Sequence, residues 1–527
     1  MALRHGLDDL AAELLALGSG TLARNTGNFD AFFAVVQRLG PERIRRWPAL
    51  EAAAIWVLSL TNQLRLAAIR LDELEVQIPR LIMEGRTFIT ENLRTPFDRT
   101  DPHTGMQCWV DMMRILIASL AGESAKALQL AHAWKRNFPR ATEYDHATVN
   151  CVTGLAHFMN DRLPEAERSA LAALAVFREE RIEYGIAQST TCAASAQILQ
   201  GRVRQAGLLL EDASRRVSDR QASSSYVDVP LSTLRALVQL ECGEPAAALP
   251  AAQENLERSA SLPFPLLLHC SLCVVARSLL ALNRPDEALA AFDRVIFHGN
   301  AEAQAWWDEK FSIERARTAA VAGETDKSAF EGPPQAGEVL ELLMVSRRAP
   351  SPALLPALRS RLQQAEGRRD SEALSLGLFL KARIEHEMGQ PLQARRSVQL
   401  LLASPITRNR VGSLAALAAG LRPMFNEALQ SLLCNPAAVT PELRQLAVLL
   451  GEVQADDPRQ LPPAALSKRE RQIAAALLDG LSNREIAERF HVTESTVKWH
   501  LWNLFQKLGV RHRTGAARVL NKLRLVC

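Results

Sequence analysis

The side chains with the clearest chemistry lie near the C-terminal end of the sequence, in a basic stretch that holds two tryptophans. Lys498 can donate hydrogen bonds to guanine O6 and N7, and Trp499 and Trp502 can contact a thymine methyl group or a sugar. These three residues are the predicted base contacts. The alternative for either tryptophan is packing on the rest of the chain or on a second subunit, because exposed aromatic rings mark contact surfaces.

Hydroxyl, amide and cationic side chains near these three residues suit phosphate oxygens. Several stand at predicted helix N-termini, where backbone N–H groups add to the attraction for an anion. The predicted phosphate contacts are Ser482, Asn483, Thr493, Ser495, Thr496, Lys507, Arg511 and Arg513. A solvated surface role is the alternative for each of the three cations.

Two short helices are predicted ahead of the tryptophans. Ser467 and Glu470 have the spacing of a capping box, which opens a first helix that stops at Gly480. Ser482 and Glu485 repeat this spacing and open a second helix. The two helices therefore lead directly into the segment that carries the base contacts.

A third predicted helix is capped by Thr493 and ends at Gly509, and a fourth begins at Thr514. At about 100° per residue, the apolar side chains of the third helix fall on one face, which must pack against the other helices. They are Val497, Leu501, Leu504, Phe505 and Leu508. The predicted base contacts fall on or beside the opposite face. A short helix, a tight turn and a longer basic helix are the helix-turn-helix pattern, whose second helix enters the DNA major groove.

Charge is distributed unevenly along the 527 residues. Residues 464–527 contain 12 Lys and Arg against 5 Asp and Glu, a net charge of +7. Residues 1–463 contain 50 against 53, a net charge of −3, so the overall +4 hides a basic tail. Because a compact basic segment is typical of nucleic-acid-binding modules, we predict double-stranded DNA as the partner of this tail.

The sequence before the tail has an internal repeat. In each repeat a Gly, Asn or Asp precedes an Ala by five residues, and successive pairs are 39, 40, 42 and 40 residues apart. The pairs are Gly122/Ala127, Asp161/Ala166, Gly201/Ala206, Gly243/Ala248 and Asn283/Ala288, with outlying pairs Asn62/Ala67 and Gly389/Ala394. The first residue can end a helix in the left-handed conformation, and the Ala lets the next helix pack closely. Each repeat is predicted to be a helical hairpin.

Hairpins of this kind bury their apolar faces by stacking into a superhelix. Residues 158–177 and 279–296 resemble tetratricopeptide repeats, whose period of about 34 residues is shorter. The predicted fold class is all-α, with a tetratricopeptide-like superhelix followed by a four-helix helix-turn-helix domain. The predicted parts are a repeat region at 1–450, a linker rich in Pro and acidic residues at 451–463, and a DNA-binding domain at 464–527.

Composition and missing motifs narrow the classes of function. The 48% of hydrophobic and 23% of charged residues indicate a globular chain. The N-terminus lacks a signal-peptide pattern and no apolar run reaches about 18 residues, so we expect a cytoplasmic protein without a membrane partner. There is no P-loop and no nucleophile motif, and the cysteines lack metal-site spacing. We therefore expect no enzyme activity, cofactor or metal.

Four aromatic residues of the repeats are either core residues or line a binding surface: Trp134, Trp306, Trp307 and Phe264.

The tail resembles the LuxR-type (NarL/GerE-like) DNA-binding domain in LSKRERQIAAALLDGLSNREIA and TESTVKWHLWNLFQKLGVRHRTGAA. The motif positions are Glu470, Gly480, Ser482, Glu485-Ile486-Ala487, Thr496-Val497-Lys498, His500 and Lys507-Leu508-Gly509-Val510. Region 4 of sigma factors shares the first half of this pattern, but TVKxH followed by KLGV favours the LuxR type. The resemblance implies that the TVKxH helix is the recognition helix and that the last helix mediates dimerisation on DNA. Because two tryptophans replace the smaller or charged side chains of the family, the operator sequence is not carried over.

The whole arrangement resembles the large MalT-like, ATP-dependent LuxR regulators, in which a helical-repeat sensor precedes the same tail. Residues 1–70 resemble the helices that follow the nucleotide-binding module of those proteins, and this sequence lacks that module. The resemblance implies a transcription regulator, an activator rather than a repressor. Its repeats would sense an inducer or a regulatory protein, with RNA polymerase as a further candidate partner. The alternative is an interaction scaffold that its tail anchors to DNA.

Overall fold

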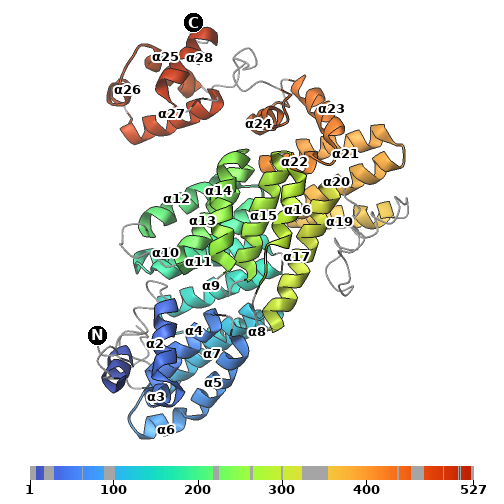
Figure 1. Cartoon of the computed structure of the whole chain (residues 1–527). Helices are drawn as coiled ribbons and strands as arrows, with labels where there is room; N and C mark the ends of the chain where they lie inside the picture. The colour runs from blue at the N-terminus through green and yellow to red at the C-terminus, as the bar shows by residue number, and fades with distance from the viewer. Residues whose placement is uncertain are drawn as a thin grey trace. The chain divides into compact units, whose positions relative to one another are not determined.

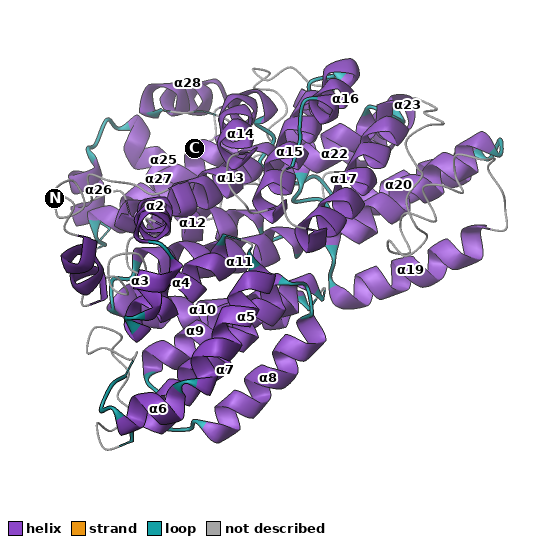
Figure 2. Cartoon of the chain, turned by 60° about the horizontal axis from the view of Figure 1, so that its bottom comes forward, coloured by secondary structure: helices purple, strands orange, loops and turns teal. Residues whose placement is uncertain are grey.

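The computed structural model divides the chain into two compact units, Met1–Phe425 and Asn426–Cys527 (Figure 1). Every regular element of the described residues is an α-helix, so the all-α prediction is confirmed (Figure 2). The described residues are 8–16, 29–61, 63–87, 101–160, 162–217, 225–260, 265–297, 301–322, 354–435, 438–452, 468–490, 492–508, 510 and 512–523. None of the helices described there is long and apolar enough to cross a membrane.

The first unit begins with a group of helices and continues as a series of hairpins. The first group is α2 (Phe29–Leu39), α3 (Pro41–Arg45), α4 (Pro48–Leu60), α5 (Leu64–Val76) and α6 (Ile78–Met83). The hairpins are α7 (Pro102–Leu120) with α8 (Ser124–Asn137), α9 (Glu143–Met159) with α10 (Leu163–Glu179), α11 (Glu183–Leu199) with α12 (Val203–Val217), α13 (Ser225–Glu241) with α14 (Pro245–Ala260), and α15 (Pro265–Ala281) with α16 (Pro285–Asp293). The later helices are α17 (Ala301–Ala322), α19 (Leu354–Arg368), α20 (Ser371–Glu387), α21 (Pro391–Ala403), α22 (Val411–Ala418) and α23 (Arg422–Leu433).

The second unit contains α24 (Pro441–Leu449), α25 (Lys468–Leu478), α26 (Asn483–Arg489), α27 (Glu494–Leu508) and α28 (Arg513–Leu523). The division between the units falls inside α23. Of the proposed linker 451–463, only residues 451–452 are described. The limits 1–450, 451–463 and 464–527 therefore remain a prediction.

The turns between paired helices have the predicted left-handed residue. The φ angles are +78° at Gly122, +75° at Gly201, +82° at Gly243, +59° at Asn283 and +70° at Gly389. Two backbone hydrogen bonds close the C-terminal end of α11 at Gly201. The N–H of Gly201 donates to Ile198 O at 2.9 Å, and the N–H of Arg202 donates to Gln197 O at 2.8 Å. This is the bonding pattern of a Schellman cap. Asn62 and Asp161 lie outside the described residues.

The alanines five residues later are at the contact between the two helices of each hairpin. The side chains of Ala67, Ala127, Ala166, Ala206, Ala248, Ala288 and Ala394 are all 0% exposed. A larger side chain there would push the two backbones apart. The interpretation of the repeats as closely packed hairpins is therefore confirmed.

The first helices of successive hairpins contact one another from α7 through α9, α11 and α13 to α15. We call these five helices the first-helix row. They join neighbouring hairpins into continuous apolar cores, one of which extends from Ala147 to Leu234. Each hairpin thus covers the apolar face of the next, as a stack of repeats requires.

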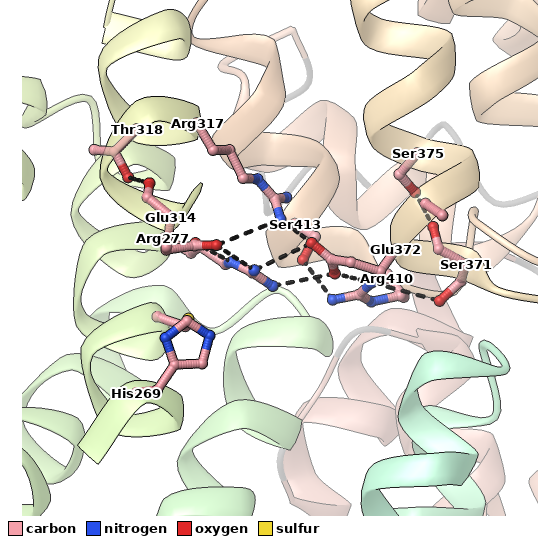
Figure 3. Close-up of polar contacts among 12 residues, drawn as sticks. His269, Arg277, Glu314, Arg317, Thr318, Ser371, Glu372, Ser375, Arg410 and Ser413 are labelled. Carbon is pink, nitrogen blue, oxygen red and sulfur yellow. Dashed lines mark hydrogen bonds and ion pairs between the residues drawn. The ribbon is translucent and has the colours of Figure 1, made fainter. Parts of the chain in front are cut away.

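Six buried or half-buried charges connect helices that are far apart in the sequence, and we call them the six-charge cluster. Figure 3 labels all of them except Glu241. Arg277 of α15 donates to Glu314 of α17 at 2.8 and 2.9 Å. The same guanidinium donates to Glu372 of α20 at 3.2 Å. The other members are Arg317, Arg410 and Glu241. Three positive and three negative charges balance, as burial demands.

Burial and charge shift the pKa values of groups in and beside this cluster. Burial would raise the pKa of Glu314, but the charges of Arg277 and Arg317 outweigh it and lower that pKa to about 2. Burial lowers the pKa of His269, a neighbour on α15, to about 4. Both groups have folded-state pKa values below their ordinary ones. Each therefore contributes stability that is present at neutral pH and is lost on acidification.

We predict that the free energy of unfolding of the first unit falls as the pH drops from 6.5 to 4. In this window His269 takes up a proton in the unfolded chain but not in the folded chain. The resulting loss in the free energy of unfolding is about 3 kcal/mol at most. Urea unfolding followed by circular dichroism at pH 7, 5.5 and 4 measures the loss. His269→Gln is expected to flatten this pH dependence, whereas the control His386→Gln, at an exposed position, leaves it unchanged. Equal pH profiles for His269→Gln and the wild type would refute the assignment.

A second prediction concerns the buried alanines. Ala127→Leu is expected to destabilise the chain by about 1–3 kcal/mol, because its side chain has no space between α7 and α8. Ala125→Leu on the exposed side of α8 is the matched control and is expected to change stability by less than about 0.5 kcal/mol. Urea titration measures both. Similar losses in the two variants would contradict the close packing.

Candidate nucleic-acid interface

Helices α25 to α28 surround a small apolar core of their own. Helix α27 contacts each of the other three helices. The buried members of this core are Ile473, Ala474, Ala476, Leu477, Ile486, Ala487, Val497, Leu501, Leu504, Ala516 and Leu520. This core fixes which side of α27 is left for solvent.

The turn before α26 is set by a capping box, as predicted. Gly480 has φ +81° and ends α25. The N–H of Glu485 donates to Ser482 Oγ at 3.3 Å, and the N–H of Ser482 donates to Glu485 Oε2 at 2.6 Å. The hydrogen bond from Ser482 lowers the pKa of Glu485. Ser467, the predicted cap of α25, lies outside the described residues.

Helix α27 begins with the predicted cap at Thr493. Its Oγ1 accepts from the N–H of Thr496 at 3.2 Å and lies 2.9 Å from the hydroxyl of Thr496. The apolar stripe of this helix packs on the core, where Val497 and Leu504 are 0% exposed and Leu501 is 5% exposed. Phe505 is half-buried, and the side chain of Leu508 lies outside the description.

The opposite side of α27 carries Lys498 and Trp502. Lys498 is exposed, and 49% of Trp502 is exposed. Being four residues apart, they stand one above the other on one helix face. Among the residues that the structure describes, no carboxylate forms an ion pair with Lys498. The structure thus brings these two predicted base contacts together on one accessible surface.

Other predicted contacts are placed only in part. Trp499, Ser495 and Lys507 belong to α27, but their side chains are outside the described set, and Arg511 lies wholly outside it. Asn483 is the first residue of α26 and is half-buried.

Arg513 has a structural partner that its sequence context did not suggest. Its guanidinium donates to the carbonyl oxygens of Leu477, at 3.5 Å, and Leu481. It thereby satisfies carbonyl groups at and beyond the C-terminal end of α25, where a cation also suits the helix dipole.

His512 also has a role that the sequence prediction missed. Its Nδ1 accepts from the N–H of Gly515 at 3.1 Å and so caps α28, which begins at Arg513 rather than at Thr514. A histidine is an unusual cap, which explains why cap preferences did not identify it.

Of the four aromatic residues that the sequence singled out in the repeats, Trp134 and Trp307 are core residues. Trp134 is 1% exposed and donates from Nε1 to Cys108 O at 3.0 Å. Trp307 is 3% exposed and packs against Phe297 and Phe311. The side chain of Trp306 and all of Phe264 lie outside the described residues.

Comparison with known families matches residues 464–520 to the luxR family of bacterial regulatory proteins, also named GerE. Curated bacterial relatives include the transcriptional regulatory protein LnrK of Bacillus subtilis (strain 168), 41% identical over 81 residues, or 15% of this chain and 36% of that protein. Two others are the CsgBAC operon transcriptional regulatory protein of Escherichia coli (strain K12) and the probable csgAB operon transcriptional regulatory protein of Salmonella typhimurium (strain LT2). Each is 47% identical over 58 residues, or 11% of this chain and 27% of the relative.

The chain thus spans about a third of the length of these relatives, or less. The family match covers α25, α26, α27 and most of α28, including the capping box of Ser482 and Glu485 and the accessible face with Lys498. Residues 464–520 therefore form a helix-turn-helix domain of the luxR family of bacterial regulatory proteins.

Proposed function

We propose that this chain is a transcription regulator that binds a specific double-stranded DNA sequence through α27. The observation that carries the proposal is the exposed face of α27 with Lys498 and Trp502, opposite a buried apolar stripe, in a domain of the luxR family. A helix of this kind fits the width of the major groove. The net charge of +7 in residues 464–527 adds attraction to any DNA sequence.

In this proposal the base contacts are Lys498, Trp499 and Trp502. The lysine donates to guanine, which reads sequence, while the indole rings supply apolar contact with thymine methyl groups or sugars. Lys498 has no carboxylate partner among the described residues, so its binding to a base breaks no ion pair within that part of the chain.

The backbone of the DNA is held by groups at the N-termini of α26 and α27. The Oγ atoms of Ser482 and Thr493 each accept a cap hydrogen bond, so the Ser482 hydroxyl proton stays available for a phosphate oxygen. The proposed phosphate contacts are Ser482, Asn483, Thr493, Ser495, Thr496, Lys507 and Arg511. Arg513 is assigned instead to positioning α25, because its guanidinium already binds two carbonyl groups.

At the level of the whole chain we propose a dimer on DNA that activates transcription and contacts RNA polymerase in the cytoplasm. The repeats would sense an inducer or a regulatory protein. Support comes from the relatives, which are transcriptional regulatory proteins, and from the stacked hairpins, whose surface suits large ligands.

A second candidate function is a protein-interaction scaffold that the tail anchors to DNA. Exposed apolar side chains on α5 and α6 favour it, since such rows mark protein contacts. They are Leu66, Ile69, Val76 and Met83, which are 44%, 48%, 80% and 81% exposed. A stoichiometric protein partner, with no effect of small molecules on DNA binding, would favour the scaffold.

We predict that Lys498→Ala relaxes the preference for one base pair by about 1–3 kcal/mol, because a direct base contact is lost. Arg511→Ala should instead weaken binding to all sequences and reduce the slope of log affinity against log salt by about one. A duplex selected from a randomised pool, and its single-base variants, provide the measurement by fluorescence anisotropy. Lys126→Ala, an exposed lysine of α8, is the control. Unchanged sequence preference in Lys498→Ala would overturn the assignment of the groove face.

Arg513→Met separates positioning from phosphate binding. We expect the amides of α25 and α28 to exchange faster in the full chain, with a local loss of about 1–2 kcal/mol, because carbonyl groups lose their donor. The salt slope of DNA binding should stay unchanged. Arg489→Met, which breaks an exposed ion pair with Asp479 and a cation–π contact with Phe490, is the control. A lower salt slope with unchanged exchange would make Arg513 a phosphate contact, as its sequence position suggested.

A further inference from the structure

A segment late in the first unit packs against the first-helix row, far from its sequence neighbours. Helix α22 contacts α13, α15 and α17, and all eight of its residues are buried. Before it, Asn409 donates from Nδ2 to Gly201 O at 3.0 Å, across 208 positions of sequence. We call residues 404–418 the inserted segment.

Two glycines allow this segment to lie in direct backbone contact with the row. A Cβ atom on Gly412 of the inserted segment would lie 2.1 Å from Leu240 O. On the other side, a Cβ atom on Gly201 would lie 2.2 Å from Ile406 O. Neither distance is possible for real atoms, so a single methyl group at either position prevents docking in this form.

Arg410 anchors the inserted segment through its guanidinium, which points toward Glu372 (Figure 3). Its side chain is 1% exposed. It donates from Nε to Glu241 Oε1 at 3.0 Å and from Nη1 to Glu372 Oε2 at 2.5 Å. Ser413 follows on the next turn and donates to Glu241 through both its N–H, at 3.0 Å, and its hydroxyl, at 2.6 Å. A planar guanidinium matches such a carboxylate pair better than any other side chain does.

The six-charge cluster is neutral only while Arg410 is present. Without it, Glu241, Glu314 and Glu372 face Arg277 and Arg317, which leaves one net negative charge in a buried place. Burial penalises an unpaired carboxylate strongly. The vacated surface would therefore favour a ligand that brings a guanidinium back.

The helix in the inserted segment depends on its docking. Eight residues are too few for a helix that is stable alone in water, and residues 404–410 are not helical. An ionic anchor adds less net stability than apolar packing of the same volume would. On leaving the row the segment would lose its helix and regain conformational entropy.

We propose that the inserted segment is a built-in ligand of the surface formed by α13, α15, α17 and α20, and that the same surface binds an arginine-bearing, otherwise apolar helical segment of a partner protein. This inference deepens the proposed sensing by the repeats and rests on it. The partner class follows from Arg410 and α22, which show what the surface accepts: one guanidinium followed by a short helix of small and apolar side chains.

In the wild-type chain the inserted segment competes with any added peptide for the same surface. A tethered segment has an effective concentration in the millimolar range, so a free peptide of equal affinity cannot displace it from the wild-type chain. Gly412→Ala weakens docking by steric contact with Leu240 and adds no charge. Gly367→Ala in α19 is the matched control, because a Cβ atom there would meet nothing within 4 Å.

The probe is a labelled, end-capped peptide of sequence SPITRNRVGSLAALA, residues 404–418, and its binding to the full-length variants is measured by fluorescence anisotropy. We expect binding to Gly412→Ala to be about tenfold tighter, or more, than binding to Gly367→Ala. A second peptide with Gln in place of Arg410 should lose about tenfold in affinity. Trypsin should cleave after Arg410 in Gly412→Ala and not in the control.

Equal peptide binding by the two variants would overturn the proposal, as would equal affinity of the two peptides or continued protection of Arg410 in Gly412→Ala. If Gly412→Ala unfolds, as judged by circular dichroism, hydrogen exchange of the wild type decides. The inserted segment should then open at lower denaturant than α13 and α15, and exchange only together with them would refute the proposal. None of these measurements involves DNA, so failure of the DNA-binding proposal would be seen separately in the Lys498→Ala experiment.

Discussion

The first unit depends on one constraint, the approach of two helices to within the size of a methyl group. The seven repeat alanines are fully buried, and the five described turn residues that precede them use the left-handed conformation to reverse the chain in two or three residues. Such turns hold the two helices of a hairpin side by side. Because the same geometry recurs at each repeat, the first helices form a row, and both the apolar cores and the six-charge cluster are assembled on that row.

Local patterns in the sequence predicted local structure correctly. The spacing of Gly201 and Ala206 predicted a hairpin, Ser482 and Glu485 predicted the start of α26, and the stripe from Val497 predicted the buried face of α27. These features involve residues within one or two helical turns, so composition and periodicity are sufficient. The matched family residues added what periodicity could not, which is that this helix-turn-helix belongs to the luxR family.

Contacts between distant residues were beyond such reasoning. Arg410 and Glu241 are 169 positions apart, and nothing in the sequence around either residue distinguishes it from a surface charge. Arg513 was predicted to contact phosphate as a cation of the basic tail, and its hydrogen bonds to carbonyl groups at and beyond the end of another helix could not be foreseen from its sequence. The role of Gly412 could not be predicted either, since a glycine inside a helix usually only weakens that helix. The structure explains the glycine, because the backbone of Leu240 leaves no room for a Cβ atom at this position.

The contact between Asn409 and Gly201 has a mechanical consequence. A linear array of repeats can be pulled apart one hairpin at a time from either end, because each hairpin is held only by its neighbours. Here the chain between these two residues forms a loop that is closed by the buried contacts of the inserted segment. If the ends of the unit are pulled, the hairpins inside the loop bear no force until the contacts of the inserted segment break. The array would then extend in one large step, as a shielded loop does, instead of by gradual unravelling.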